Sequence, residues 1–330
     1  MPTTLATRVI GTDSAALAAA QRVLADGGLV AFPTETVYGL GADATDGRAV
    51  ARLYAAKGRP AFNPLIAHVT DAGAARLLGR FDPAAERLAA AFWPGPLTLV
   101  LPKAPGCTVA DLATAGLDTI ALRVPAHPVA RALLAAFGRP IMAPSANRSG
   151  HVSPTTAEHV LADLVGRIDL VIDAGPTELG LESTIIACTD AAPALLRPGG
   201  IAREAIERVL AVPLADGPPD ADAAALAPAA PGMLDSHYAP RAALRLDPSV
   251  VNDGEALLAF GPGLPPGAER AVRVLNLSPT ADLVEAAANL FSHLRALDRS
   301  GATTIAVTPI PHEGLGEAIN DRLRRAAAPR

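Results

Sequence analysis

Residues 28–65 read GLVAFPTETVYGLGADATDGRAVARLYAAKGRPAFNPL, and this stretch decides the fold. Its apolar run Leu29–Phe32 predicts a buried strand that stops at Pro33. A loop rich in hydroxyl groups follows, in which Gly39 and Gly41 would let the backbone approach a ligand. A helix over about residues 46–56 and a second apolar strand over 65–69 complete the unit. The order strand, loop, helix, strand predicts an α/β fold with a polar loop beside its first strand.

Two cations close the predicted helix, because Lys57 and Arg59 stand just before Pro60. Fixed positive charge beside a hydroxyl-rich loop suits a phosphate polyanion next to a small polar substrate. The alternative is an ordinary α/β unit in which both cations are solvated. Taken alone, the pair does not decide between these two interpretations.

Length and composition bound the class of protein. The chain has 330 residues, which favours two domains, and its formal net charge of −5 disfavours a strongly basic nucleic-acid binder. Cys107 and Cys188 form no C-x-x-C pair, so we expect a reduced compartment without disulfides. No secretory signal is evident, and no apolar run reaches the ~20 residues of a membrane span. These features predict a cytoplasmic protein that does not enter a membrane.

Hydrophobic periodicity and turn residues divide the rest of the chain. Residues 211–231 are rich in Ala, Pro, Asp and Gly without a period, which predicts an interdomain linker. Alternating strands and helices after it predict a small α/β domain with a mostly parallel sheet. We expect helices over 14–26, 83–92, 129–137, 201–210, 279–297 and 315–328, and one starting at 153–155. We expect strands over 97–101, 119–123, 141–143, 170–173, 183–187, 194–196, 243–246, 256–260, 272–275 and 304–307.

Three common catalytic motifs are missing from the sequence. These are the G-x-x-x-x-G-K-[ST] spacing of a P-loop, the H-E-x-x-H of a zinc hydrolase and the G-x-S-x-G of a serine nucleophile. Glu35 and Glu182 could form a carboxylate pair, but the sequence does not fix their separation. Any ATP chemistry must therefore use a cradle assembled from separated segments.

Polar residues at predicted strand ends are candidates for that cradle, since ligands of open α/β sheets bind there. Ser145 and Asn147 follow one such strand, and Arg197 ends another. Arg123 ends a third and could bind a carboxylate through two hydrogen bonds. Each has a structural alternative, which is a self-capped turn for the Ser–Asn pair and a surface cation for Arg197. His68 by itself is more typical of a buried core histidine than of a ligand.

Five motifs in order resemble the YrdC/Sua5 family, the threonylcarbamoyl-AMP synthases. Together they cover Gly28 to Pro240, and the last resembles the linker of the longer Sua5 branch. They are P-T-E-T-V-Y-G-L-G with K-x-R-P-x-x-N-P-L in 33–65, P-S-A-N at Pro144–Asn147, E-S-T-I at Glu182–Ile185, L-R-P-G at Leu196–Gly199, and P-G-M-x-x-x-H-Y-A-P at Pro231–Pro240.

The resemblance implies a domain organisation. The first domain would be the YrdC-like α/β fold, a twisted mixed sheet with flanking helices, over residues 1–211. A linker or flap would occupy 212–241. A small Rossmann-like α/β domain of the Sua5 C-terminal type would occupy 242–330.

The resemblance also implies an activity, L-threonylcarbamoyladenylate synthesis. L-threonine, bicarbonate or CO2, and ATP would give threonylcarbamoyl-AMP and pyrophosphate for the t6A modification of tRNA at position 37. Mg2+ would come with ATP, held mainly by phosphate oxygens and water rather than by a metal site of the protein. The partners implied are ATP, L-threonine, bicarbonate and the tRNA threonylcarbamoyltransferase machinery that uses the product. Direct binding of tRNA is left open.

Residue by residue, the resemblance implies the following site. The catalytic signature falls on Lys57, Arg59, Ser145 and Asn147. L-threonine would lie against Thr36, His68, Arg123, Ala143 and Ser183. ATP would lie against Arg59, Asn63, Thr119, Ser145, Ser153, Arg197 and Tyr238.

Tyr238 follows the predicted linker directly. We expect its segment to fold over the nucleotide pocket and shield the product from water, as catalytic lids do. The alternative is a Tyr–Pro plug between two domains. Two other function classes also stay open. One is an RNA-binding module without catalysis, which the acidic net charge disfavours. The other is a carbamoyl-adenylating enzyme of related fold, which usually carries zinc-finger regions.

Overall fold

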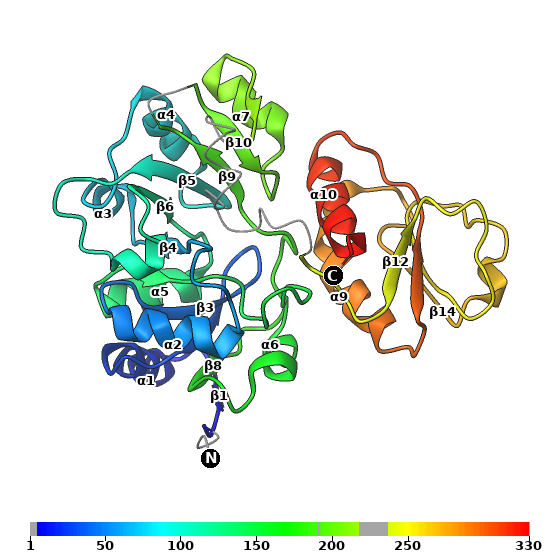
Figure 1. Ribbon diagram of the computed structural model, residues 1–330, viewed down its shortest axis with the longest axis horizontal. Helices are drawn as coiled ribbons and strands as arrows, with labels where there is room; N and C mark the ends of the chain where they lie inside the picture. Colours follow the sequence, from blue (N-terminus) through cyan, green and yellow to red (C-terminus); the bar gives the residue numbers. More distant parts are fainter. Residues whose placement is uncertain (1–4, 190–191, 218–236, 330) are drawn as a thin grey trace.

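The computed structural model describes residues 5–189, 192–217 and 237–329. Figure 1 shows two units side by side, a large sheet covered by helices and a smaller sheet at the C-terminal end of the chain. Both units alternate strands and helices, so the predicted α/β class and its division into a large mixed and a small parallel sheet are confirmed.

The larger sheet has eleven strands among the described residues. They are β1 (Arg8–Ile10), β2 (Val30–Pro33), β3 (Tyr38–Asp43), β4 (Ile66–His68), β5 (Leu97–Pro102), β6 (Thr119–Arg123), β7 (Ile141–Met142), β8 (Leu170–Ile172), β9 (Thr184–Ala187), β10 (Ala194–Arg197) and β11 (Ala215–Asp216). Their order is β1-β8-β2-β3-β7-β4-β6-β5-β9-β10-β11. Parallel pairs such as β4 with β6 mix with antiparallel pairs such as β5 with β6.

Helices pack on both faces of this sheet. They are α1 (Ser14–Ala25), α2 (Gly47–Lys57), α3 (Ala72–Arg76), α4 (Pro83–Phe92), α5 (Pro128–Phe137), α6 (Ala157–Leu164) and α7 (Arg203–Leu210), with a 3-10 turn, η1 (Asp111–Thr114). Side chains alternate along a strand. Val30 and Phe32 therefore pack with α1 and α5, whereas Ala31 packs in the core beneath α2, α4 and α7.

The predicted glycine loop is wrong in one respect, because residues 38–43 form a strand rather than a loop. β3 pairs with β2 as an antiparallel hairpin, with Phe32 opposite Gly39 and Val30 opposite Gly41. At position 41 a Cβ atom would lie 2.9 Å from the Phe32 ring and 3.0 Å from the Val30 carbonyl oxygen. This glycine therefore permits close packing of the sheet, not the approach of a ligand.

Several predicted boundaries also shift. The helix expected from 153–155 begins at Ala157, because the Thr156 hydroxyl caps it by accepting from the His159 amide. The helix expected from 279 begins at Leu283, capped by Asp282. The two-residue strand β11 lies inside the segment predicted as linker.

The smaller unit contains β12 (Ala243–Leu246), β13 (Ala256–Ala259), β14 (Arg273–Asn276) and β15 (Thr304–Val307), with α9 (Leu283–Asp298), α10 (Leu315–Ala327) and a 3-10 turn, η2 (Ala268–Arg270). Its four strands run in the order β12-β15-β13-β14, and every pair is parallel. Leu258, Leu290, Phe291 and Ile305 form part of its core.

The segment that joins the units is described only at its two ends. Leu214 is buried in the first core, and β11 pairs with β10, so residues up to 217 belong to the edge of the large sheet. Residues 218–236, which hold most of the predicted linker and the start of the Pro231–Pro240 motif, lie outside the described residues. Among the described residues, no helix is both long and apolar enough to cross a membrane.

Helices α9 and α10 lie on the side of the smaller unit that faces the large sheet (Figure 1). Arg203 of α7 pairs with Glu317 of α10 at 2.6 Å, and Arg322 of α10 pairs with Glu182 at 2.8 Å. At Gly180 a Cβ atom would lie 2.4 Å from the Ala287 carbonyl oxygen of α9. The two units therefore meet closely at residues 180–203 of the first unit.

Candidate active site

A small cavity of about 40 Å³ lies where the β2–β3 turn, β4, β6 and the loop after β7 meet residues 237–238. Nine of the fourteen predicted site residues line it. The full lining is Thr36, Val37, Arg59, Ile66, His68, Arg123, Ala143, Pro144, Ser145, Glu182, Ser183, Arg197, His237 and Tyr238. The cavity thus brings together residues that are about two hundred positions apart in the chain, such as Thr36 and Tyr238.

The other five predicted residues, Lys57, Asn63, Thr119, Asn147 and Ser153, are not part of this lining. Lys57, Asn63 and Ser153 each hydrogen-bond a lining residue. Thr119 starts β6, whereas Arg123 ends it, and four residues of strand span roughly 13 Å. The structure therefore does not bring Thr119 to the cavity.

One end of the cavity is built around Arg123. Its Nη2 donates to Glu35 Oε1 at 2.7 Å and to the Thr36 hydroxyl at 3.0 Å, and its Nε donates to the Gly95 carbonyl at 3.4 Å. Burial alone would raise the pKa of Glu35, but the Arg123 charge together with the hydrogen bonds from Arg123 and from backbone amides holds the pKa below its ordinary value. The carboxylate thereby fixes the guanidinium at the end of β6.

The predicted pair of Glu35 and Glu182 does not form a shared carboxylate site. Glu35 pairs with Arg123, whereas Glu182 pairs with Arg322, so each negative charge has its own guanidinium. The two carboxylates therefore act as anchors for cations rather than as an acid–base pair.

His68 lies beside Arg123 in the cavity wall and is buried. Its Nδ1 lies 3.3 Å from the Ile66 carbonyl oxygen. Burial, and then the Arg123 charge, lower the pKa of His68 to about 3. The imidazole is therefore neutral near pH 7 and can offer a hydrogen bond without adding charge.

Lys57 is placed differently from the expectation of a phosphate contact. Its ammonium donates to the backbone carbonyls of Ser145 at 2.6 Å and Asn147 at 2.5 Å. Burial, and then the Arg59 charge, hold the pKa of Lys57 well below its ordinary value. The side chain thus fastens the P-S-A-N loop, on which Ser145 faces the cavity.

Arg59 lines the cavity directly. Its Nη2 donates to Asn63 Oδ1 at 2.6 Å and to the Pro64 carbonyl at 3.0 Å. Burial lowers the pKa of Arg59 to about 10, so the guanidinium keeps its charge at neutral pH. Asn63 therefore orients a cation toward the cavity.

A second guanidinium comes from β10, next to the edge strand of the large sheet. Arg197, at the end of β10, donates to the Ser183 carbonyl at 2.8 Å and to the Ser183 hydroxyl at 3.2 Å. The Ser183 hydroxyl also lies 2.7 Å from Thr98 Oγ1. The Ser153 hydroxyl donates to Glu182 Oε1 at 2.5 Å. Arg59 and Arg197 together give this end of the cavity positive charge.

Residues 237–239, which we call the strap, include His237 and Tyr238, which line the cavity. The Tyr238 ring stacks on Phe291 with centroids 5.7 Å apart, and the His237 ring meets it edge-on at 4.0 Å. The Ala239 amide donates to the Gly150 carbonyl at 2.8 Å. Tyr238 has φ of 62°, a strained region for a bulky residue. Such strain is typical of functional segments.

The lining includes five residues that were not predicted as site residues: Val37, Ile66, Pro144, Glu182 and His237. Four of the five, all except Ile66, stand inside the quoted motifs, so their position in those motifs was a usable signal. Ile66 directly follows the first motif and contributes apolar surface, for which its residue type gives no signal.

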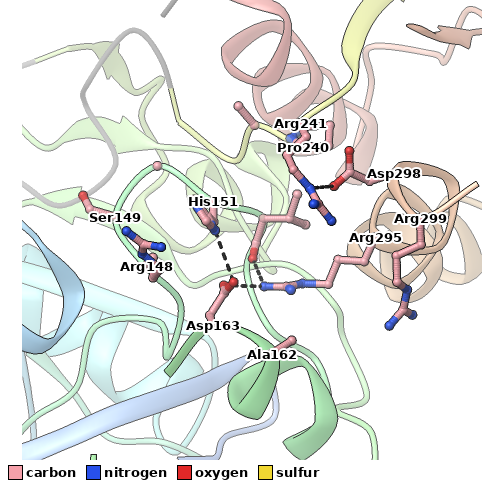
Figure 2. A pocket seen from close by; sticks show the side chains of 13 residues that line it. Arg148, Ser149, His151, Ala162, Asp163, Pro240, Arg241, Arg295, Asp298 and Arg299 are labelled. Carbon is pink, nitrogen blue, oxygen red and sulfur yellow. Dashed lines mark hydrogen bonds and ion pairs between the residues drawn. The ribbon is translucent and has the colours of Figure 1, made fainter. Parts of the chain in front are cut away.

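A larger hollow of about 640 Å³ lies between the two units on the other side of the strap. Figure 2 shows His151 and Arg295 converging on Asp163, and Arg241 beside Asp298. Its lining carries four arginines but only two aspartates, so it keeps a net positive charge although each aspartate is paired with an arginine. We place the candidate site in the smaller cavity, because nine predicted site residues line it and none of the fourteen lines the larger hollow.

Comparison with known proteins agrees with this geometry. A family model described as telomere recombination matches residues 22–199, and a model described as threonylcarbamoyl-AMP synthase, C-terminal domain, matches residues 201–328. The threonylcarbamoyl-AMP synthase of Pyrococcus abyssi is 44% identical over 92% of this chain and 91% of its own. That of Bacillus subtilis is 42% identical over 97% and 95%.

A solved structure extends the likeness to three dimensions. The crystal structure of P. abyssi Sua5 complexed with L-threonine superposes with a TM-score of 0.86 at 41% identity, covering 97% of each chain. Sequence and fold therefore agree over nearly the whole length of the chain, which belongs to the Sua5/YrdC family of threonylcarbamoyl-AMP synthases, in its two-domain Sua5 form.

Proposed function

We propose that the chain synthesises threonylcarbamoyl-AMP and pyrophosphate from L-threonine, bicarbonate or CO2, and ATP. The observation that carries the proposal is a single cavity in which two sets of polar side chains meet, each containing a guanidinium. One end holds Arg123, Thr36 and neutral His68, and the other holds Arg59 and Arg197. The first end suits a small hydroxylated amino acid, and the second suits phosphates.

In this proposal L-threonine lies against Thr36, His68, Arg123, Ala143 and Ser183. The Arg123 guanidinium, held by Glu35, binds the threonine carboxylate, because guanidinium geometry matches a carboxylate. Neutral His68 and the hydroxyls bind the polar groups of the substrate without adding charge. A substrate that lacks the threonine hydroxyl would leave a buried hydrogen-bonding group of the pocket unpaired, which costs about 1–3 kcal/mol of binding free energy.

ATP lies against Arg59, Ser145 and Arg197, with Tyr238 above. Asn63, Asn147 and Ser153 act through Arg59, Lys57 and Glu182 respectively, since those are the contacts that they make. Thr119 would reach ATP only if the nucleotide extended along β6. Lys57 contributes by holding the Ser145 loop rather than by touching phosphate.

The chemistry then needs alignment more than a nucleophilic side chain. The threonine amine is first carboxylated to a carbamate. A carbamate oxygen attacks the α-phosphorus of ATP, the bond to the bridging oxygen breaks, and pyrophosphate leaves. Arg59 and Arg197 neutralise the charge on the phosphates.

Mg2+ would accompany ATP in this proposal. Among residues 5–189, 192–217 and 237–329, no group of three or more His, Cys, Asp or Glu side chains is arranged to hold a metal ion. In the proposal, phosphate oxygens and water hold the cation. We propose a cytoplasmic location, where the product is available to the tRNA threonylcarbamoyltransferase machinery.

The strap must move for the substrates to enter. Ligand sites usually measure roughly 300–1,000 Å³, whereas this cavity measures about 40 Å³. His237 and Tyr238 form its wall toward the second unit. We propose that they open for entry and close over the product, which protects the labile mixed anhydride from water.

The test is ATP–pyrophosphate exchange measured with L-threonine and bicarbonate, with each omitted in turn, and with L-valine as the matched substrate. We expect exchange to require both, and L-valine to be about five- to 150-fold less efficient. Equal efficiency with L-valine would contradict the threonine pocket. RNA binding without any exchange would instead favour the non-catalytic module, and exchange that depends on carbamoyl phosphate would favour the related carbamoyl-adenylating enzyme.

A further inference from the structure

Arg322 is the largest side chain that the described part of the chain buries completely. It lies on α10 of the smaller unit, where no motif marks it in the sequence. A buried guanidinium is costly unless every donor is paired, so its partners show what it is for. Among those partners only Asp321 belongs to α10.

The other hydrogen bonds of Arg322 cross to the first unit. Its Nε donates to Glu182 Oε2 at 2.8 Å, and its Nη2 donates to the Pro198 carbonyl at 2.9 Å. Its guanidinium also lies 5.0 Å from the centre of the Tyr238 ring, within the range of a cation–π contact. One side chain therefore joins the E-S-T-I, L-R-P-G and H-Y-A-P motifs.

Those three contacts are all on one end of the cavity. Glu182 accepts from Ser153, and Pro198 directly follows Arg197. Burial alone would raise the pKa of Glu182, but Arg322 and then Arg197 hold it below its ordinary value. Without Arg322, the buried Glu182 carboxylate would attract Arg197 away from Ser183 or take up a proton.

We infer that Arg322 is a positioning residue, through which the C-terminal domain fixes the ATP end of the active site and the strap. The inference rests on the proposed function, because it uses the proposed contacts of Arg197, Ser153 and Tyr238 with ATP. The threonine end has no direct part in it, since Thr36, His68 and Arg123 form no hydrogen bond with Arg322 among the described residues. Ser183 is connected to Arg322 only indirectly, through Arg197 and Glu182. Seating of the second domain and nucleotide binding are thereby coupled.

A second cross-domain ion pair provides a matched control. Arg203 pairs with Glu317 of α10 at 2.6 Å, yet neither residue lines the cavity or contacts the strap. Arg203→Gln therefore weakens the contact between the two units without touching the site. A role of Arg322 in domain association alone would give Arg322→Met the same phenotype as Arg203→Gln.

The experiment measures the affinities of the full-length protein for ATP in bicarbonate-free buffer and for L-threonine by calorimetry, with melting temperature in parallel. For Arg322→Met we expect ATP affinity to fall by about tenfold or more, because a charged hydrogen-bond network is lost. L-threonine affinity should change by less than about threefold. Arg203→Gln should lower the melting temperature while leaving both affinities unchanged.

Two further variants keep the inference falsifiable if Arg322→Met fails to fold. Arg322→Lys retains the charge with fewer directed hydrogen bonds and should show the same selective loss at smaller size. Arg322→Met with Glu182→Gln removes both buried charges and should regain stability but not ATP affinity. Unchanged ATP affinity in folded Arg322→Lys, or equal loss for ATP and L-threonine, would overturn the inference.

Failure of the proposed function looks different. In that case the unsubstituted protein would give no threonine-dependent exchange, whatever Arg322 does. If exchange occurs but Arg322→Met binds ATP like Arg203→Gln, only the inference fails.

Discussion

The two sheets of this protein bury different kinds of side chain. Beside the eleven-strand sheet, Glu35 and Arg123 form a buried ion pair, and the buried Lys57 is hydrogen-bonded to backbone carbonyls. The four-strand sheet buries mainly apolar side chains, represented by Leu258 and Phe291. A buried charge is stable only in one fixed arrangement, whereas apolar side chains need only fill the space. The first unit therefore holds charged side chains in fixed positions, and the second unit mainly contributes stability.

The place where the second unit departs from this pattern is informative. Its buried Asp321 and Arg322 lie on α10, which faces the first unit, and not inside its own core. Apart from Glu255, Ser278 and Thr308, the buried polar side chains of the second unit thus lie at its boundary with the first. The comparison predicts that substitutions in the first unit harm activity, and that those in the second core harm stability.

The largest effect on activity should come from Arg123→Met. It removes the cation at the threonine end and leaves Glu35 buried without its partner. We expect kcat/KM for L-threonine to fall by about a hundredfold or more, and the free energy of unfolding to fall by about 3–5 kcal/mol. Steady-state kinetics and denaturant unfolding provide the two measurements. Near-normal turnover would remove Arg123 from the site.

Phe291→Ala should affect stability about as strongly, but in the second unit. Phe291 is fully buried and stacks on Tyr238, so the substitution leaves a cavity and costs about 3–5 kcal/mol. L-threonine affinity measured on the folded protein should stay near normal, because Arg123 and His68 lie in the other unit. A loss of threonine binding comparable with that of Arg123→Met would contradict this difference in role between the two units.

The smallest effect concerns pH. His68 has a pKa of about 3 in the folded protein, whereas an unfolded histidine titrates near 6.5. Below pH 6.5 the unfolded state therefore binds the extra proton, and stability falls as pH falls toward 3. The slope from this residue is about 1.4 kcal/mol per pH unit.

Unfolding measured at pH 6.5, 5.5 and 4.5 checks this expectation. Replacement of His68 by glutamine should flatten the pH dependence, whereas replacement of exposed His312 should not. If both variants keep the full slope, the loss of stability in acid comes from other groups such as the buried carboxylates.

Much of the fold could be predicted because local signals and tertiary packing agree. The strand at 119–123 and the helix at 83–92 were predicted with the bounds that the structure has. The strand over 38–43 was missed, because its two glycines are typical of a loop and only their close packing against β2 explains them. Glycine at a sheet contact and glycine in a turn look the same in a sequence.

The candidate site was predictable as a set of residues but not as an arrangement. Lys57 and Arg59 look equivalent in the chain, yet one holds backbone carbonyls and the other lines the cavity. The register at the end of α2 decides which of them points inward. The side-chain direction of these two cations depends on the P-S-A-N loop packed beside them. The position of that loop cannot be predicted from the sequence.

The sequence by itself determined the α/β class, the family and most of the residues that line the cavity, because motifs of fixed spacing carry them. Only the tertiary structure decided that Glu35 and Glu182 serve different cations, and that Arg322 reaches Glu182. These are contacts between residues about 90 to 140 positions apart. Such contacts follow from how two units pack, and no local pattern of residues records that packing.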